Sequence, residues 1–274
     1  MNGPILVSVT DGLARLTLNR PDRLNAFDAE LAHEWARVTA EVVARDDVGA
    51  IVLDAAGTAF CAGGDVLAMS HGLGSGTEIT ALAEVINLGI RALTESAIPV
   101  VAAAHGTTAG GGLGILMCSD YAIVGADSRI GSRYANIGLT PDLSVTAQLA
   151  RAIGERRALQ LVLQDHMLTA QQALDWGLVA EVVAGADAAA TADAVRARAD
   201  EIARFWLAGA HRAYGQAKRL VRSEPARSFA EQLAEEARTI GAAYETADAQ
   251  ARIAAFAEAS ARRASRPAPS QENS

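Results

Sequence analysis

Short apolar runs alternate with longer stretches that carry one apolar face over the first two thirds of the chain. Ile5–Val9 and Leu13–Leu18 flank Asp11-Gly12, a pattern typical of a β-hairpin closed by a tight turn. Continuous apolar runs, typical of buried strands, follow at residues 50–53, 99–104 and 121–124. Between the runs, apolar residues recur every three or four positions, as on one face of a helix. Strand and helix in repetition predict an α/β fold.

Residues that flank the helical patterns predict where the helices begin. Asp28 is the expected N-cap of a helix that ends near Arg45. A second helical pattern covers residues 79–93. The glycine-rich stretch 72–76 predicts a mobile loop between Asp65 and this second helix.

The last third of the chain has a different pattern. From about Asp187 onward Ala, Arg and Glu dominate and no strand pattern returns, which predicts an almost wholly helical region. We expect residues 1–200 to form the core and residues 201–264 to form a C-terminal helical region that serves oligomerisation. Residues 265–274 are polar and contain two prolines, which predicts a disordered tail.

Composition narrows the class of protein. With 274 residues, half of them hydrophobic, the chain can bury one substantial core. Its net charge of −8 argues against nucleic acid or an anionic membrane as the main partner. Cys61 and Cys118 suggest neither a disulfide framework nor a metal cluster. No secretion signal or membrane-spanning run is visible, so we expect a cytoplasmic location.

Two glycine-rich turns each follow an apolar run. One is Phe60-Cys61-Ala62-Gly63-Gly64-Asp65, and the other is Ala109-Gly110-Gly111-Gly112-Leu113-Gly114. Each turn by itself is typical of a tight turn against a crowded core, since glycine lets backbones approach closely. Two backbone N–H groups that converge on one oxygen, however, form an oxyanion hole.

In combination these motifs resemble the crotonase superfamily, the enoyl-CoA hydratase/isomerase group, over residues 16–256. Further matches are Asn19-Arg20-Pro21, Leu24-Asn25-Ala26 and Trp176-Gly177-Leu178-Val179. The resemblance implies a spiral of ββα turns, an acyl-CoA cleft within residues 1–200, and a homotrimer or dimer of trimers. It also implies coenzyme A as part of the substrate, with no permanently bound cofactor. The N–H groups of Gly64 and Gly111 would then bond the thioester carbonyl oxygen.

The resemblance implies coenzyme A contacts from backbone groups of Asn25, Ala26 and Ala62. Arg20 and Arg23 are candidates for the phosphates, although arginines just before a helix are usually solvated. Further candidates for the phosphates are Lys218 and either Arg262 or Arg263.

Both glutamates of the family's hydratases are absent, because their positions hold Gly114 and Tyr134 here. The carboxylate that remains nearby, Asp142 in Gly-Leu-Thr-Pro-Asp, has two interpretations. It is either the N-cap of a helix that begins near Leu143 or a catalytic aspartate. Dienoyl-CoA isomerases, the 4-chlorobenzoyl-CoA dehalogenase and the ring-epoxide isomerase of phenylacetate degradation carry such an aspartate. The ring-epoxide isomerase also lacks both glutamates, so we take Asp142 as catalytic.

Tyr134 is expected to line the acyl pocket, to orient Asp142, or only to pack. Asn87 stands where the dehalogenase has a histidine base, which argues against dehalogenation. One carboxylate can remove a proton from one carbon and return it to another, which is enough for a double-bond shift. We therefore favour an enoyl-CoA isomerase. A hydratase with an atypical site and a non-catalytic acyl-CoA-binding protein are the alternatives.

Overall fold

The computed structural model describes residues 3–72, 75–164 and 166–264. The chain forms two compact units, Met1–Arg222 and Ser223–Ser274. Within the described residues, both β-sheets belong to the first unit, and the second unit is helical.

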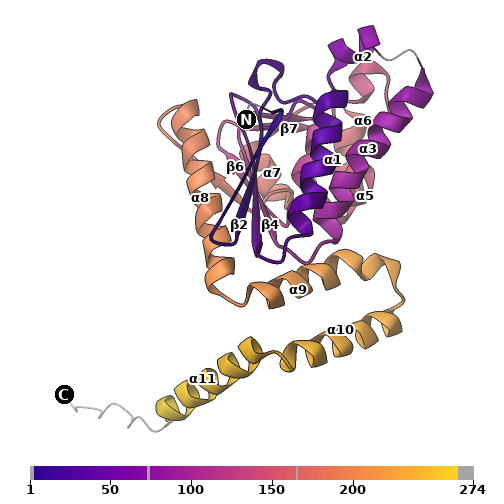
Figure 1. Cartoon of the computed structure of the whole chain (residues 1–274). Coiled ribbons are helices and arrows are strands. Elements are labelled where there is room, and N and C mark those ends of the chain that lie inside the picture. Colours follow the sequence, from indigo (N-terminus) through magenta and orange to yellow (C-terminus); the bar gives the residue numbers. More distant parts are fainter. Residues whose placement is uncertain (1–2, 73–74, 165, 265–274) are drawn as a thin grey trace, which may run out of the picture. The chain divides into compact units, whose positions relative to one another are not determined.

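The larger sheet of the first unit has six strands in the order β1-β2-β3-β4-β6-β9 (Figure 1). Their bounds are β1 (Ile5–Thr10), β2 (Leu13–Leu18), β3 (Ala50–Ala55), β4 (Val100–Ala104), β6 (Tyr121–Gly125) and β9 (Glu181–Val183). The predicted hairpin joins β1 and β2, with Ile5 opposite Leu18, and the remaining pairs are parallel. A smaller sheet consists of β5 (Thr107–Ala109), β7 (Arg129–Gly131) and β8 (Leu168–Thr169). The predicted α/β class is confirmed.

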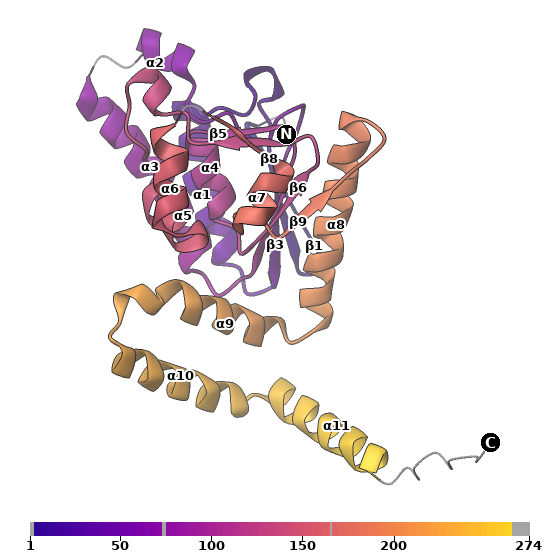
Figure 2. The ribbon, with the colours of Figure 1, turned by 180° about the vertical axis from the view of Figure 1, so that it is seen from behind.

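Helices cover both faces of the larger sheet (Figures 1 and 2). The helices of this unit are α1 (Ala29–Val43), α2 (Val66–Gly72), α3 (Gly76–Glu95), α4 (Gly111–Met117), α5 (Val145–Ile153), α6 (Glu155–Leu163), α7 (Ala170–Trp176), α8 (Ala188–Ala208) and α9 (His211–Ser223). Alternate residues of β4 point to the two faces, as the pleat of a strand requires. Val101 and Ala103 pack with Val195 of α8, while Ala102 belongs to the core on the opposite side.

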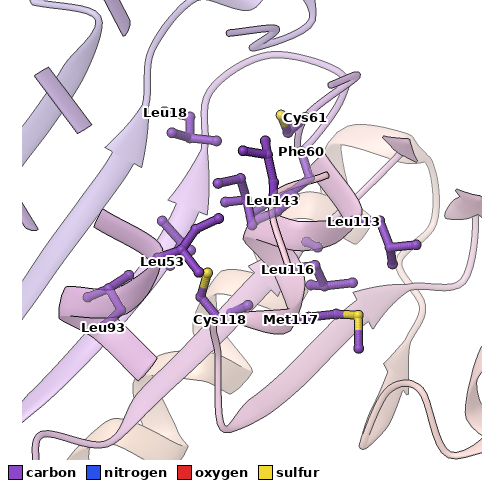
Figure 3. Packing of buried hydrophobic residues seen from close by; sticks show 14 of the residues in the cluster. Leu18, Leu53, Phe60, Cys61, Leu93, Leu113, Leu116, Met117, Cys118 and Leu143 are labelled. Carbon is purple, nitrogen blue, oxygen red and sulfur yellow. The ribbon is translucent and has the colours of Figure 1, made fainter. Parts of the chain in front are cut away.

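The short helix α4 lies inside that opposite core. All seven of its residues are buried, and Leu113, Leu116 and Met117 belong to the apolar cluster drawn in Figure 3. The cluster also contains Phe60 from one glycine turn and Leu143 from the segment before α5. This packing fixes where both ends of α4 lie.

A helix occupies part of the stretch predicted as a mobile loop. Val66–Gly72 form α2, and α3 begins behind Ser75, whose hydroxyl accepts a hydrogen bond from the Glu78 N–H. The loop prediction was therefore wrong for residues 66–72. The Asp65 carboxylate accepts the Ala68 N–H over 3.0 Å and caps this helix, a local signal that the glycine-based prediction did not use. Residues 73 and 74 lie outside the described residues.

The second unit contains α10 (Phe229–Tyr244) and α11 (Ala247–Ala264). Ser228 and Glu231 form a capping box that begins α10. Large apolar side chains of α10 are exposed: Phe229, Leu233, Ile240 and Tyr244. A role of residues 201–264 in oligomerisation stays a prediction, and the predicted disordered tail lies outside the described residues.

The boundary predicted after residue 200 falls inside α8. Residues of α8 before and after position 200 pack on the same face of the sheet. The first compact unit instead continues to Arg222. Among the described residues, no helix is long and apolar enough to cross a membrane.

Candidate active site

The two glycine turns lie against each other. Cys61 and Thr108 form a parallel β-bridge, in which the Ala109 N–H donates to Cys61 O over 3.0 Å. A β-carbon at Gly63 would lie 3.1 Å from the Gly111 nitrogen, so glycine lets the turns come this close. The structure thus brings together two stretches that are far apart in the sequence.

Gly64 and Gly111 line the same cavity, which has a volume of about 320 Å³. Neither backbone N–H donates a hydrogen bond to any residue that the structure describes. Gly111 begins α4, so its N–H is one of the unpaired donors at the positive end of the helix. Two such donors at one cavity can both bond an oxygen that gains negative charge.

Asp142 lines this cavity as well, between η2 (Ala135–Ile137) and α5. Its Oδ1 accepts a hydrogen bond from the Tyr134 hydroxyl over 2.5 Å. Asp142 as a whole residue is exposed, but partial burial of its carboxyl raises the pKa of that group, and the hydrogen bond from Tyr134 opposes part of the rise. Burial and the adjacent carboxyl also raise the pKa of the Tyr134 phenol, which therefore stays protonated and acts as the donor.

The structure rules out Asp142 as a side-chain N-cap. Helix α5 begins at Val145, Ser144 occupies the N-cap position, and that position has no side-chain capping bond. Asp142 contributes its backbone carbonyl, which accepts the Val145 N–H over 3.0 Å. The capping interpretation was wrong because the carboxylate bonds Tyr134 instead.

Gly114 is packed against the segment that follows Asp142. A β-carbon at Gly114 would lie 2.1 Å from the carbonyl oxygen of Leu143. No larger side chain fits there unless that backbone moves. The position that holds a glutamate in the resembling hydratases is thus filled here by the backbone of Leu143.

The rest of the cavity is mostly apolar, and α3 contributes much of the wall. Its apolar lining residues are Phe27, Met69, Ile79, Leu82, Ala83, Ile86, Leu139 and Leu143. Glu84, an exposed carboxylate, and the half-buried Asn87 also line it. Sequence reasoning missed Glu84, although its place one turn before Asn87 on the same helix could have indicated it.

The expected coenzyme A contacts lie on two neighbouring segments, the loop of Asn25 and Ala26 and the glycine turn that contains Ala62. The Ala62 N–H donates to Leu24 O over 3.0 Å, which joins the loop to the glycine turn. Asn25 is fully buried, and its amide donates to Ala56 O and Ala59 O and accepts from the Arg20 N–H. Because these groups are engaged, the Asn25 side chain holds the loop. The Asn25 backbone is engaged as well, since its N–H donates to Arg20 O and its carbonyl accepts from the Cys61 thiol.

The residues on either side of Asn25 differ in whether their polar groups are already hydrogen-bonded within the protein. The Ala26 N–H donates to Arg23 O, and its carbonyl accepts from Arg20. Arg20 also pairs with Asp28 at 2.5 Å, so it is a structural cation. Arg23 is exposed, and its guanidinium bonds no residue in the described part of the chain.

Lys218 does not lie on the surface. Its Nζ donates to Leu93 O and Ile98 O over 2.6 Å each and pairs with Asp120 at 3.1 Å. The interpretation of Lys218 as a phosphate contact was wrong, because its side chain is buried and its ammonium group already has these partners.

The two cysteine thiols and the His105 imidazole are buried, which limits their reactivity. Cys61 and Cys118 are buried, and burial raises the pKa of each thiol to about 12, so neither is a thiolate nucleophile. His105 is buried and its Nε2 bonds Gly57 O. Within the described residues, no group of three or more His, Cys, Asp or Glu could hold a metal ion.

Comparisons with known proteins relate most of the chain to one family. The family model described as "Enoyl-CoA hydratase/isomerase" matches residues 8–263. A "Probable enoyl-CoA hydratase" of Rhodobacter capsulatus is 32% identical over 93% of this chain and 95% of its own. The 1,2-epoxyphenylacetyl-CoA isomerase of Escherichia coli is 33% identical over 65% and 69%. A crystal structure of an enoyl-CoA hydratase from Mycobacterium smegmatis has a TM-score of 0.83 at 26% identity, covering 93% and 96%.

Proposed function

Because the chain belongs to the enoyl-CoA hydratase/isomerase family, we propose that it isomerises an enoyl-CoA with Asp142 as the single acid/base. The observation that carries this proposal is the composition of the cavity. One carboxylate with a raised pKa and two unpaired backbone N–H groups line the same space. These are the parts that a proton shift next to a thioester needs.

The N–H groups of Gly64 and Gly111 act on the thioester carbonyl. When a proton leaves the carbon next to that carbonyl, the electron pair moves onto the oxygen and an enolate forms. Both donors are fixed before the reaction by the packed turns, so they stabilise the oxygen as its charge develops. The position of Gly111 at the start of α4 adds the positive end of the helix dipole.

Asp142 moves the proton. In its ionised form the carboxylate takes a proton from the carbon next to the thioester carbonyl. The neutral carboxyl then returns a proton to the carbon two bonds further along, and a β,γ double bond becomes an α,β double bond. No water or second acid is consumed, so the proton and electron pair balance within the substrate.

Hydration is the alternative, and it needs a second positioned group that acts on water. Among the residues that line the cavity, Glu84 on α3 is the second carboxylate. Both Glu84 and Asp142 are exposed residues, but Asp142 is the one that the Tyr134 hydroxyl holds. The backbone of Leu143 fills the space beside Gly114, and Tyr134 is committed to Asp142. These contacts favour isomerisation over hydration.

Coenzyme A would lie along the loop of Asn25 and Ala26 and beside Ala62 of the adjacent glycine turn. The uncommitted guanidinium of Arg23 is the cation of that loop best suited to a phosphate. The apolar wall from α3 and the loop before α5 suits an acyl chain. The names of the relatives include both isomerases and hydratases, so the choice of isomerisation rests on the residues of the cavity.

The test compares isomerisation with hydration in wild type, Asp142→Asn and Glu84→Gln. We expect isomerisation to exceed hydration, and Asp142→Asn to lose about 10²–10⁴ of the isomerisation rate because the base is gone. Glu84→Gln tests the other carboxylate of the cavity and should lose far less. Efficient hydration by wild type, or unimpaired isomerisation by Asp142→Asn, would contradict the proposal.

A further inference from the structure

We infer that Tyr134 and Gly114 are positioning residues that hold the Asp142 carboxylate in place from two sides. The inference rests on the proposed function for the task of that carboxylate. Two contacts position the carboxylate: a hydrogen bond from one side chain, and the close packing of the turn after Asp142 against α4.

The first contact fixes one oxygen of the carboxylate. The Tyr134 hydroxyl donates to Oδ1 over 2.5 Å, and the Tyr134 side chain is only 8% exposed. The Tyr134 carbonyl accepts the N–H groups of Ile137 and Leu139, which anchors its backbone. With Oδ1 engaged, Oδ2 is the oxygen left to exchange a proton with the substrate.

The second contact fixes the backbone that follows Asp142. Leu143 and Ser144 have φ angles of 49° and 67°, in the left-handed region that residues with a β-carbon rarely adopt. Two such residues in succession persist only where the surroundings impose them. Strained backbone directly after a candidate catalytic residue is therefore an observation that needs a cause.

Helix α4 supplies that cause. The Leu143 carbonyl oxygen lies 2.1 Å from where a β-carbon at Gly114 would stand, and Leu143 Cδ1 lies 2.7 Å from that of Gly111. Leu143 is buried there at 5% exposure. The turn thus occupies a hollow that exists because both α4 residues are glycine, and Asp142 is carried into the cavity by the turn.

Neither residue needs to touch the reacting atoms, so their loss should change the proton transfer rather than the binding of substrate. In Tyr134→Phe the hydrogen bond that lowers the Asp142 carboxyl pKa is absent, while burial still raises it. The ionised carboxylate then forms only at higher pH. We expect the acidic limb of the pH profile of kcat/KM to shift to higher pH, with kcat reduced about tenfold on the plateau and KM little changed.

Gly114→Ala tests the second contact. The added β-carbon must displace the Leu143 carbonyl, and with it Asp142, so we expect kcat to fall about 10- to 100-fold while KM changes little. Gly241→Ala is the matched control, because nothing lies within 4 Å of a β-carbon there. It should behave as wild type. Thermal unfolding is measured for each variant, and Tyr134→Phe keeps the test decisive if Gly114→Ala does not fold.

A carboxyl-carbon NMR titration of Asp142 tests the positioning of its carboxylate independently of the proposed reaction. A higher Asp142 pKa in Tyr134→Phe than in wild type is expected whatever the substrate. An unchanged titration and pH profile in Tyr134→Phe, with wild-type kcat in Gly114→Ala, would overturn the inference and leave the proposed function standing. Full activity of Asp142→Asn would instead remove the proposed function, even if the titration shifts as expected.

Discussion

The two ends of α4 carry opposite kinds of polar cluster. At the first end the Gly111 N–H has no acceptor among the described residues, and Asp142 receives one side-chain hydrogen bond, from Tyr134. Beyond the last end, Asp120 pairs with Lys218 and with Arg222 at 3.1 Å each and accepts the Val100 N–H. The first cluster leaves a backbone donor and a carboxylate available for a substrate, whereas the charged groups of the second cluster pair with one another.

Cavity size does not distinguish the two ends. The cavity lined by Asp120, Lys218 and Arg222 has a volume of about 520 Å³, against about 320 Å³ for the one lined by Asp142. The Arg222 guanidinium also bonds Gln148 and the Ser119 carbonyl. The larger cavity therefore has cations that are already committed, while the smaller one has unused donors where charge can develop. Available hydrogen-bonding groups, more than volume, indicate where chemistry takes place.

Within α4, the largest expected effect comes from the removal of one unused donor. Gly111→Pro lacks the backbone N–H, and proline is tolerated at the first position of a helix. We expect a loss of about 10²–10³ in kcat. Gly111→Ala is the control, since it adds a β-carbon next to Leu143 but keeps the N–H. Equal rates for a folded Gly111→Pro and Gly111→Ala would show that this N–H does not stabilise the enolate.

The next effect lies at the other end of α4 and should be one of stability. Lys218→Met removes the short ammonium bonds to the carbonyls of Leu93 and Ile98, which keep only the longer bonds from the Ser96 hydroxyl, and it leaves Asp120 with one cation fewer. We expect the free energy of unfolding to fall by about 2–3 kcal/mol in chemical denaturation, because buried polar groups that lose hydrogen bonds are costly. The kcat of the remaining folded protein should stay near wild type. A large loss of kcat with no loss of stability would mean that the two ends are not separate in function.

The smallest effect concerns the stability cost of the candidate base. Burial raises the folded pKa of Asp142, so the folded state binds its proton more tightly than the unfolded state does. Its contribution to stability is present below the unfolded pKa and is lost as pH rises through the folded pKa. At neutral pH, Asp142→Asn should therefore be at least as stable as wild type, although it is inactive. A clear drop in its unfolding midpoint at pH 7 would contradict the raised pKa.

The local patterns were read correctly where neighbours in sequence determine the structure. The hairpin of Ile5–Val9 and Leu13–Leu18 and the N-cap Asp28 both depend on contacts a few residues apart, and both are confirmed. The helix α2 was missed although its cap is local, since the Asp65 carboxylate accepts the Ala68 N–H. Lys218, in contrast, was misread because its partners are carbonyls more than a hundred residues away in the chain.

For the site, the sequence by itself determined which residue types were available: two glycine turns after apolar strands, one nearby carboxylate and no glutamate at the two hydratase positions. Only the tertiary structure decided how these residues are used. It turned the Asp142 carboxylate toward Tyr134 and away from capping a helix, and it filled the space beside Gly114 with the backbone of Leu143. The physical reason is that hydrogen-bond partners and excluded volume come from segments distant in sequence, and no local pattern specifies them.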